Sequence, residues 1–182
     1  VVRSPDGRVQ VEISTRAATG AGSRIQYRVS LSGRTLIDAS GLGARTRDGV
    51  EFGRDTLILG YAPVAIDSSF EQFPGKRRHV IDRANEVTLR LLEYATRPLE
   101  WQLVVRAYDD GVALRYRFPR QPGWSRLELA DEQTEFAFPA GAMATTSMLE
   151  SFTTSHESTY ERHRVEEIPA NRLLALPLLV EV

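Results

Sequence analysis

Cysteine, lysine and long hydrophobic runs are absent or nearly absent from this 182-residue sequence. With no cysteine, the chain forms no disulfide, offers no thiolate to zinc and has no thiol nucleophile. Lys76 is the only lysine, so arginine carries almost all of the positive charge. No apolar run approaches the roughly 20 residues that a membrane-spanning helix needs, and we therefore expect no membrane span.

An excess of charge of one sign is also missing. The 23 lysines and arginines nearly balance the 24 aspartates and glutamates, and the formal net charge is -1. No net positive field is available to attract phosphates, which argues against nucleic acid as the main partner. Hydrophobic residues make up 42% of the chain, which argues against disorder. The composition and length predict an ordinary globular domain that buries roughly 70% of its unfolded surface.

Both ends of the sequence are unusual for a complete domain. The chain begins at Val1, without an initiator methionine or a signal peptide. It ends in the apolar, extended run 176–182, without a turn or a polar tail. Because a complete domain seldom ends inside a strand, we expect a processed or fragmentary start and a truncated end.

Hydrophobic residues recur with a period of two rather than 3.6. Apolar and polar side chains alternate most clearly in five segments: 9–14, 25–31, 87–91, 101–107 and 112–118. Such alternation is typical of half-buried strands. The spacing between strands, roughly 8 to 15 residues, suits a sandwich or a large stack of antiparallel sheets.

Strand character is weaker in four other segments: 35–37, 57–70, 124–130 and 135–138. Residues 38–56 contain several glycines among charged residues. A phosphate-binding loop needs a helix after its glycines, and since no helix pattern follows here, a connecting loop is the favoured interpretation. The one helix-like segment is 160–168, which is short and polar.

Asp109, Asp110 and Gly111 join two of the clearest strands. The pattern predicts a β-hairpin with its glycine at the position that needs a positive φ. The adjacent carboxylates are poorly placed as an acid/base pair, because neighbouring strand residues point to opposite faces. Aspartate is favoured in tight turns, where it hydrogen-bonds to its own backbone, so a turn is the favoured interpretation.

Neither a nucleophilic triad nor an anion site is the favoured interpretation of the other polar residues. No Gly-x-Ser-x-Gly elbow exists, and no strand–helix alternation would hold one. In the loop 74–79, the adjacent cations Lys76, Arg77 and Arg78 offer a site for an acidic ligand. A solvated loop explains the same residues more simply.

The segment 156–163 has the highest density of potential metal ligands. Glu157 and Glu161 lie four residues apart, and if the segment is helical they share one face. Carboxylate oxygens suit calcium, but calcium takes six to eight ligands, which two glutamates do not supply. On this chemistry alone, a solvated helical turn with Glu161 paired to an arginine is favoured over a metal site.

A longer pattern identifies a family. The run 106–119, which contains the predicted hairpin, resembles the signature hairpin of the N-terminal domain of glycoside hydrolase family 97. Further pieces resemble the same domain in the same order: 4–7, 131–136, Tyr160-Glu161 with Pro169, and 176–178. The resemblance covers essentially the whole chain.

The resemblance implies an all-β fold, an antiparallel β-supersandwich of the galactose-mutarotase-like type, truncated at its C-terminal end. In that family the domain precedes a catalytic (β/α)8 barrel and a small C-terminal β domain. Residues 1–182 would then be an incomplete N-terminal domain without the barrel, which holds the catalytic carboxylates. The chain alone is accordingly expected to be inactive and to have no catalytic residue.

The resemblance also implies a function. The domain would be a non-catalytic, carbohydrate-binding or supporting part of a calcium-dependent α-glucosidase or α-galactosidase, packing on the barrel and contributing a glutamate to the active-site calcium. Glu161 matches that glutamate best by its position after Tyr160, and Glu157 is the alternative. The partner would be an α-linked glycan bound through the missing barrel, and the family implies a periplasmic or secreted location.

A free-standing carbohydrate-binding module, or a purely structural β-sandwich, is the alternative function. Exposed aromatic side chains such as Trp101 or Trp124 would then stack on sugar rings. Both tryptophans occupy apolar positions in their predicted strands, which favours packing in the core.

Overall fold

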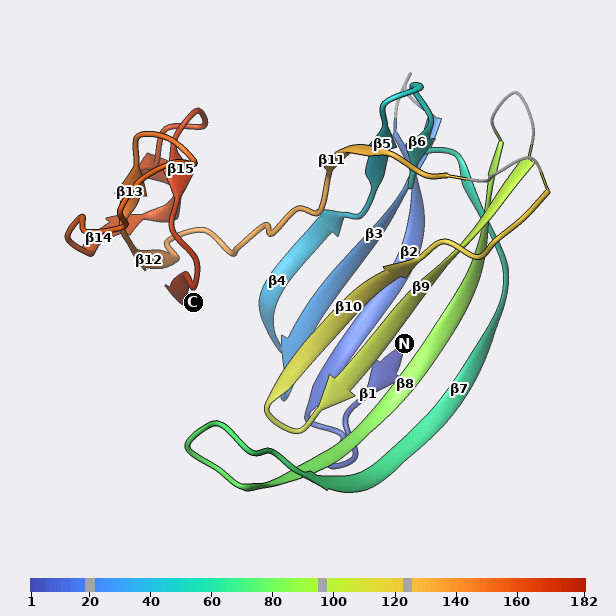
Figure 1. Ribbon diagram of the computed structural model, residues 1–182, viewed down its shortest axis with the longest axis horizontal. Coiled ribbons are helices and arrows are strands. Elements are labelled where there is room, and N and C mark those ends of the chain that lie inside the picture. The colour runs from blue at the N-terminus through green and yellow to red at the C-terminus, as the bar shows by residue number, and fades with distance from the viewer. Residues whose placement is uncertain (19–21, 95–97, 123–125) are drawn as a thin grey trace. The chain divides into compact units, whose positions relative to one another are not determined.

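The structure is a computed structural model that describes residues 1–18, 22–94, 98–122 and 126–182 (Figure 1). All strand pairs among these residues are antiparallel. The only helix in the described ranges is η1, a 3-10 helix at Val165–Glu167. No described helix has the length and apolar character needed to cross a membrane. The prediction of an all-β, antiparallel fold is confirmed.

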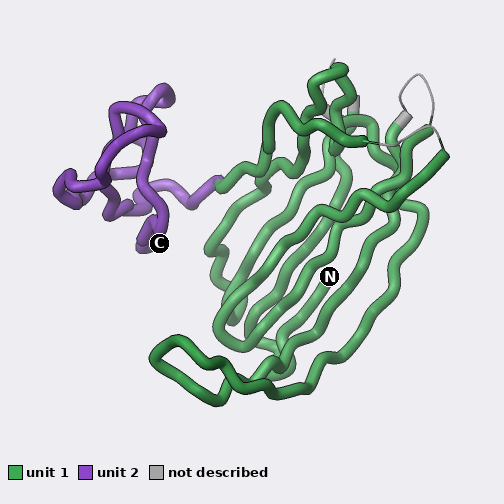
Figure 2. The backbone as a smooth tube through the Cα atoms, viewed as in Figure 1, with its two compact units in different colours: residues 1–136 green, residues 137–182 purple. Residues whose placement is uncertain are grey.

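The described chain divides into two compact units, which Figure 2 colours separately. Unit 1 consists of Val1–Phe136 and unit 2 of Ala137–Val182. Each unit has sheets of its own, and no sheet of the described residues contains strands from both.

Unit 1 contains two large sheets and one small sheet. The first has the order β1-β2-β3-β4 and consists of β1 (Val2–Arg3), β2 (Val9–Ala18), β3 (Gly22–Leu31) and β4 (Arg34–Gly41). The second has the order β10-β9-β8-β7 and consists of β7 (Thr56–Glu71), β8 (His79–Tyr94), β9 (Pro98–Tyr108) and β10 (Gly111–Arg117). The small sheet has the order β11-β5-β6 and consists of β5 (Ala44–Thr46), β6 (Glu51–Phe52) and β11 (Leu129–Glu132). The five clearly alternating segments are all strands, as predicted.

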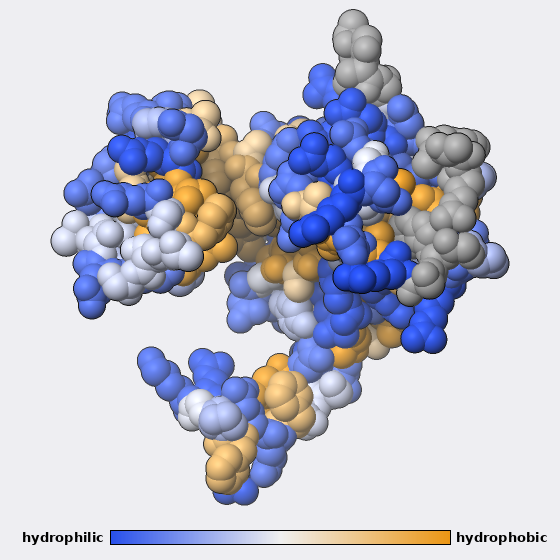
Figure 3. All heavy atoms as spheres, turned by 45° about the horizontal axis from the view of Figure 1, so that its top comes forward, coloured by the Kyte–Doolittle hydropathy of each residue, from blue (hydrophilic) through white to orange (hydrophobic). Residues whose placement is uncertain are grey.

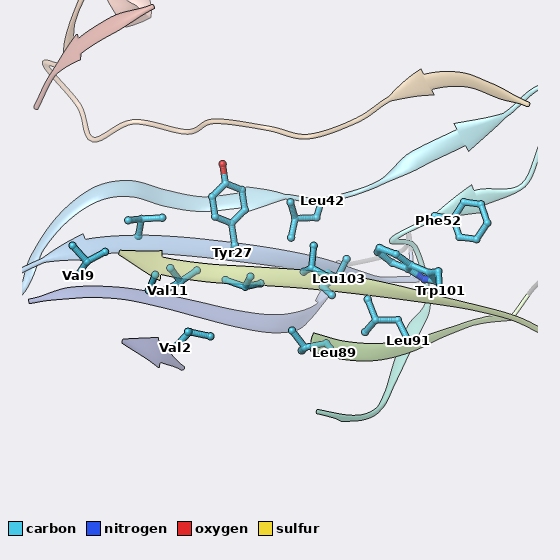
Figure 4. Close-up of a cluster of buried hydrophobic side chains, with 14 of the residues drawn as sticks. Val2, Val9, Val11, Tyr27, Leu42, Phe52, Leu89, Leu91, Trp101 and Leu103 are labelled. Atoms are coloured by element: carbon cyan, nitrogen blue, oxygen red, sulfur yellow. The ribbon is translucent and has the colours of Figure 1, made fainter. Parts of the chain in front are cut away.

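The inner sides of the two large sheets form the core of unit 1 (Figure 4). Side chains at every second position are buried there, such as Val9 and Val11 in β2 and Leu103 in β9. Trp101 has no exposed surface, and its ring meets that of Phe52 edge to face, with 5.9 Å between the ring centroids. Because each such side chain contributes about 1.5–3 kcal/mol when buried, the alternation in the sequence encodes this core.

The glycine-containing stretch 38–56 differs from the predicted connecting loop. β4 continues into it as far as Gly41, and the short strands β5 and β6 follow. Gly53 has a positive φ of 91°, and a Cβ atom there would overlap the backbone carbonyl of Leu42. Glycine at this position allows the backbone around Gly53 to approach that of Leu42 closely. β5 and β6 have only three and two residues, so they are too short to show alternation in the sequence.

Two predicted strands near the end of unit 1 were wrong or too long. Of the strand predicted at 124–130, only residues 129 and 130 belong to a strand, which is β11. Residues 124 and 125 lie outside the described residues. Residues 135–138 belong to no named strand. Glu135 nevertheless has partners for its backbone, because its N–H donates to the carbonyl of Gly41 at 2.9 Å and its carbonyl accepts from the Tyr27 hydroxyl at 2.8 Å.

The hairpin between β9 and β10 is confirmed, but its turn differs from the prediction. Tyr108 pairs with Gly111, which leaves Asp109 and Asp110 as the two turn residues. Gly111 is the first residue of β10 and does not have a positive φ. The glycine therefore begins the strand and is not needed for the turn conformation.

Unit 2 is built from short strands. β12 (Met143–Thr146) lies between β14 (Glu161–Arg164) and β16 (Leu179–Glu181), while β13 (Met148–Leu149) pairs with β15 (Leu173–Leu174). The buried residues of this unit are mostly small: Ala142, Ala144, Thr146, Ser147, Leu149 and Ala175. The segment 160–168 is not one helix, because Glu161–Arg164 form β14 and only Val165–Glu167 form the 3-10 helix η1. β14 obtains its backbone hydrogen bonds from β12, whereas an isolated short polar helix is only marginally stable.

Candidate functional site

The predicted calcium ligands lie in and next to an irregular segment of unit 2. Residues 150–160 contain no strand or helix and connect β13 to β14. His156 has a positive φ of 57°, and the aromatic side chains of Phe152 and Tyr160 are exposed. Glu157 is also exposed, and its Oε2 accepts a long hydrogen bond of 3.4 Å from the Ser155 hydroxyl. This carboxylate has its oxygens directed to a surface where a metal ion can reach them.

Glu161, the first residue of β14, has a more defined backbone. It pairs with Thr146 of β12, which is fully buried, so the strand fixes the position of its Cα atom. Its carboxylate Oε2 lies 3.2 Å from Nε2 of His163, which is an ion-pair distance when the histidine is protonated. The side chain of Glu161 is 64% exposed, so its other oxygen is open to a ligand from outside.

Glu157 and Glu161 do not form a calcium site by themselves. The segment is not helical, so Glu157 and Glu161 do not share a helix face as the sequence had suggested. In the described ranges, no three His, Asp or Glu side chains come together in a way that could hold a metal. Since calcium takes six to eight oxygen ligands, the remaining ligands would have to come from outside the described residues.

Trp101, the proposed sugar-stacking residue, is buried in the core of unit 1. Its indole Nε1 donates a hydrogen bond to Oε1 of Glu93 at 2.8 Å. A side chain with no exposed surface does not stack on a sugar, which confirms the expectation that it packs in the core. Trp124 lies outside the described residues.

Glu93 is a buried carboxylate that the sequence analysis missed. Its Oε1 accepts from the N–H of Gly53 at 2.8 Å, from Trp101 and from the hydroxyl of Thr56. Its Oε2 is buried and has no hydrogen-bond partner among the described residues. Burial raises the pKa of Glu93, and the three donors oppose that shift. The signal was available, because Glu93 continues the inward positions of Leu89 and Leu91 in β8.

The turn aspartates have structural partners. Oδ1 of Asp109 accepts the N–H of Asp6 at 2.8 Å, which ties the hairpin to the turn before β2. Asp6 in turn accepts from the Ser4 hydroxyl at 2.7 Å and from the N–H of Arg8 at 2.9 Å, and these bonds lower the pKa of its carboxyl. The turn interpretation is therefore supported over an acid/base pair.

A cavity of about 470 Å³ is lined mainly by apolar side chains of β3, β4 and β10 in unit 1. Two hydroxyl groups at its wall already have partners. The Tyr27 hydroxyl donates to the Glu135 carbonyl, while that of Tyr116 lies 2.7 Å from the Thr134 hydroxyl and accepts from Gly43. The carboxylates of Asp109, Asp110 and Glu132 also line this cavity, but most of its wall is apolar, and sugar binding needs several free polar groups that converge on the ligand.

The cations of the loop 74–79 are exposed, as expected for a solvated loop. Arg78 pairs with Glu71 at 3.2 Å, and both side chains are largely exposed. An exposed pair of this kind contributes little to stability.

Comparison with known proteins identifies the family. The family model described as Glycosyl-hydrolase 97 N-terminal matches residues 2–182. A retaining alpha-galactosidase of Bacteroides thetaiotaomicron is 25% identical over 187 residues, which covers 98% of this chain and 26% of that protein. A probable retaining alpha-galactosidase of Streptomyces bingchenggensis is 28% identical over 174 residues, which covers 96% of this chain and 25% of that protein.

A solved structure shows the same fold. A glycoside hydrolase family 97 enzyme from Pseudoalteromonas sp. strain K8, in complex with acarbose, matches with a TM-score of 0.84 at 25% sequence identity. The match covers 99% of this chain and 26% of that chain. This chain therefore spans about a quarter of the length of the relatives that it matches. The resemblance seen in the hairpin is confirmed: the chain belongs to glycoside hydrolase family 97 and corresponds to the N-terminal domain of that family.

Proposed function

We propose that this chain is a supporting N-terminal domain of a calcium-dependent α-glycosidase and that it packs on a catalytic (β/α)8 barrel. The observation that carries the proposal is the match of residues 2–182 to the N-terminal domain of the family, within relatives about four times as long. Those relatives are named as retaining alpha-galactosidases, which supports an α-linked glycan as substrate. A periplasmic or secreted location is part of the proposal and rests on the family alone.

Two carboxylates of unit 1, Glu93 and Asp109, are engaged in hydrogen bonds within the domain. Retaining glycoside hydrolysis uses two carboxyl groups about 5–5.5 Å apart on either side of the scissile bond, and both must reach the substrate. Glu93 is buried and already accepts hydrogen bonds. Asp109 is used to hold the backbone of Asp6. These groups stabilise the domain and are not available to a glycan.

The contribution of this chain to catalysis would be a calcium ligand. Glu161 is the first candidate, because its backbone is fixed by pairing with Thr146 and its side chain is exposed. Glu157 is the alternative, and it is exposed in the irregular segment. Calcium, when bound, would help to stabilise negative charge and to orient the substrate. The domain would hold one carboxylate for it in a fixed place.

The free-standing carbohydrate-binding module loses Trp101, the one tryptophan named for it that lies among the described residues. Trp101 is buried, and the apolar cavity beside β10 presents hydroxyl groups that are already engaged. We therefore retain the supporting domain as the proposed function.

An activity assay tests the proposal. The 182-residue chain and a longer protein that includes the barrel would be assayed with aryl α-galactosides and aryl α-glucosides, in calcium and in chelator. We expect hydrolysis only by the longer protein, and only with calcium. Hydrolysis by the 182 residues alone would show that catalysis lies within this chain. Activity of the longer protein that survives complete calcium removal would contradict the role of calcium.

A further inference from the structure

Strand β7 carries an exposed apolar tract at residues 57–66 that contains no charged residue. Tyr61 is 73% exposed and Val64 is 54% exposed, and the large apolar side chains before them are exposed as well: Leu57, Ile58 and Leu59. Scattered exposed apolar residues are normal on a protein surface, but a contiguous patch marks an interaction site. Hydrophobic side chains interrupt the polar surface of unit 1 in Figure 3.

The strand register shows that the tract is apolar on both faces of its sheet. Residues opposite each other in an antiparallel pair have their side chains on the same face. Tyr61 lies opposite Leu89, whose side chain is in the core, so Tyr61 is on the inner face. Pro63 lies opposite Val87 and is on the inner face, two residues after Tyr61. Val64 is the next residue and lies opposite Glu86. Because successive strand residues point to opposite faces, Val64 is on the outer face.

The inner face of β7 is open because the first sheet is narrow on this side. Its edge strand β1 has only two residues, Val2–Arg3, and the side chains at Tyr61 and Pro63 remain exposed. A cavity of about 470 Å³ lies beside β1 and is lined in part by Pro63 and Ala65. This surface can receive apolar side chains from a partner.

The edge of β7 is not built for strand addition. Among the described strands, β7 pairs with β8 alone. Proline has no N–H to donate, so Pro63 interrupts the row of donors that another strand would need. The register also shifts between Ile58 and Gly60, and a bulge of this kind twists an edge away from a neighbour. A partner would therefore pack against the side chains of the tract, and pairing of two β7 edges in a dimer is disfavoured.

We propose that the tract 57–66 is the surface through which this domain packs permanently on the rest of its own polypeptide. The inference rests on the proposed function, because it takes the protein that covers the tract to be the catalytic part of the same polypeptide. The relatives have about three quarters of their length outside the matched region, so they contain ample protein to cover the tract. A surface of ten residues without charge fits a permanent interface, because permanent interfaces are more hydrophobic than transient ones.

Hydroxyl-radical footprinting of Tyr61 tests this surface. The 182-residue chain and the longer protein would be labelled at the same concentration, with Phe73 as an internal reference. Phe73 is fully exposed and lies in the loop between β7 and β8, outside the tract. We expect modification of Tyr61 to fall several-fold in the longer protein while modification of Phe73 stays the same. Equal modification of Tyr61 in both proteins would overturn the proposal.

A charged substitution at Val64, on the other face of β7 from Tyr61, provides a second test. In the longer protein, Val64→Lys is expected to raise the modification of Tyr61 toward its value in the 182-residue chain, because removing an ammonium group from water into an apolar interface is costly. Ile81→Lys, at a position of β8 that is 70% exposed and lies outside the tract, is the matched control and is expected to leave Tyr61 protected. Circular dichroism of the 182-residue chain carrying Val64→Lys would verify that the exposed substitution leaves the domain folded. Unchanged protection of Tyr61 in the Val64→Lys protein would count against the surface.

Two other outcomes separate this inference from its alternatives. Protection of Tyr61 in the 182-residue chain that increases with protein concentration would assign the tract to a second copy and would overturn the assignment to the same polypeptide. Protection in a longer protein that lacks α-glycosidase activity would contradict the proposed function and leave the interface intact.

Discussion

The indole Nε1 of Trp101 donates to the Glu93 carboxylate at 2.8 Å, and both side chains are buried in the core of unit 1. The same carboxylate oxygen accepts from the Gly53 N–H and the Thr56 hydroxyl. Glu93 thereby connects β8 and β9 to the turn that leads into β7. A buried polar group of this kind stabilises one arrangement of the chain as long as its donors are in place.

Glu93 predicts a dependence of stability on pH. Burial raises its pKa above the usual value, so the folded domain binds this proton more tightly than the unfolded chain does. The stabilisation that comes from this proton is fully present below the pKa that Glu93 has in the unfolded chain. It is lost as the pH rises through the raised pKa that Glu93 has in the folded domain. Glu93→Gln cannot ionise, so the stability of the wild type relative to this variant is expected to decline across that window. Urea unfolding of both proteins at a series of pH values measures the difference, and a difference independent of pH would show that Glu93 does not titrate there.

Trp101→Phe is expected to move this window to higher pH. The indole N–H favours the charged carboxylate, and removing it raises the pKa of Glu93 further. Stability should also fall by about 1–3 kcal/mol, because a buried hydrogen bond is lost. Tyr116→Phe is the matched control, since the Tyr116 hydroxyl bonds to Thr134 and Gly43 and has no hydrogen bond with Glu93. The control should lower stability without moving the window, and an equal shift in both variants would contradict a direct effect of the indole.

Asp109→Ala is expected to destabilise the domain by about 1 kcal/mol, because the Asp6 N–H loses its acceptor. Its neighbour in the turn, Asp110, offers a control of the same residue type, and Asp110→Ala should change stability by no more than about 0.5 kcal/mol. The free energies of unfolding in urea give both values. If the two alanine variants are equally stable, the bond between the hairpin and the turn before β2 contributes nothing measurable.

The sequence predicted those parts of the fold that alternation encodes. In β2, β3, β8 and β9 alternate side chains are buried in the core, and in β10 alternate side chains are partly buried against it, so a period of two is visible without the structure. β5 and β6 could not be found in this way, because strands of two or three residues depend on partners distant in the chain. β14 was mistaken for a helix for the same reason, since its pairing with β12 supplies the hydrogen bonds that decide its conformation.

The candidate site was predictable only through the family. Nothing in the chemistry of the segment 156–163 favoured a metal, and the structure explains why: Glu157 and Glu161 are exposed and do not meet further carboxylates among the described residues. The proposed site, completed by residues of the barrel, would leave only one of its ligands in this sequence. Glu93 was missed for a different reason, because the alternating segment was followed only to Leu91 and the glutamate that continues its inward positions was not considered.

Glu161 is predicted to be the calcium ligand that this chain supplies. In a longer protein that includes the barrel, Glu161→Gln should weaken calcium binding by about tenfold or more, because an amide lacks the charge of a carboxylate. Calcium affinity from isothermal titration calorimetry and α-glycosidase activity on the aryl glycosides should fall together, while the free energy of unfolding of the domain changes by no more than about 0.5 kcal/mol. Glu150→Gln is the matched control, since Glu150 is an exposed glutamate in the same irregular segment.

The same titration on Glu157→Gln decides between the two glutamates. If Glu161 is the ligand, Glu157→Gln should bind calcium as the wild type does, because its carboxylate has only a long hydrogen bond to Ser155 and stabilises no strand. If Glu157→Gln loses calcium and Glu161→Gln retains it, the ligand lies in the irregular segment, and the role of Glu161 is limited to its contact with His163. Full calcium affinity in both variants would exclude this chain from the calcium site and leave only the packing role of the domain.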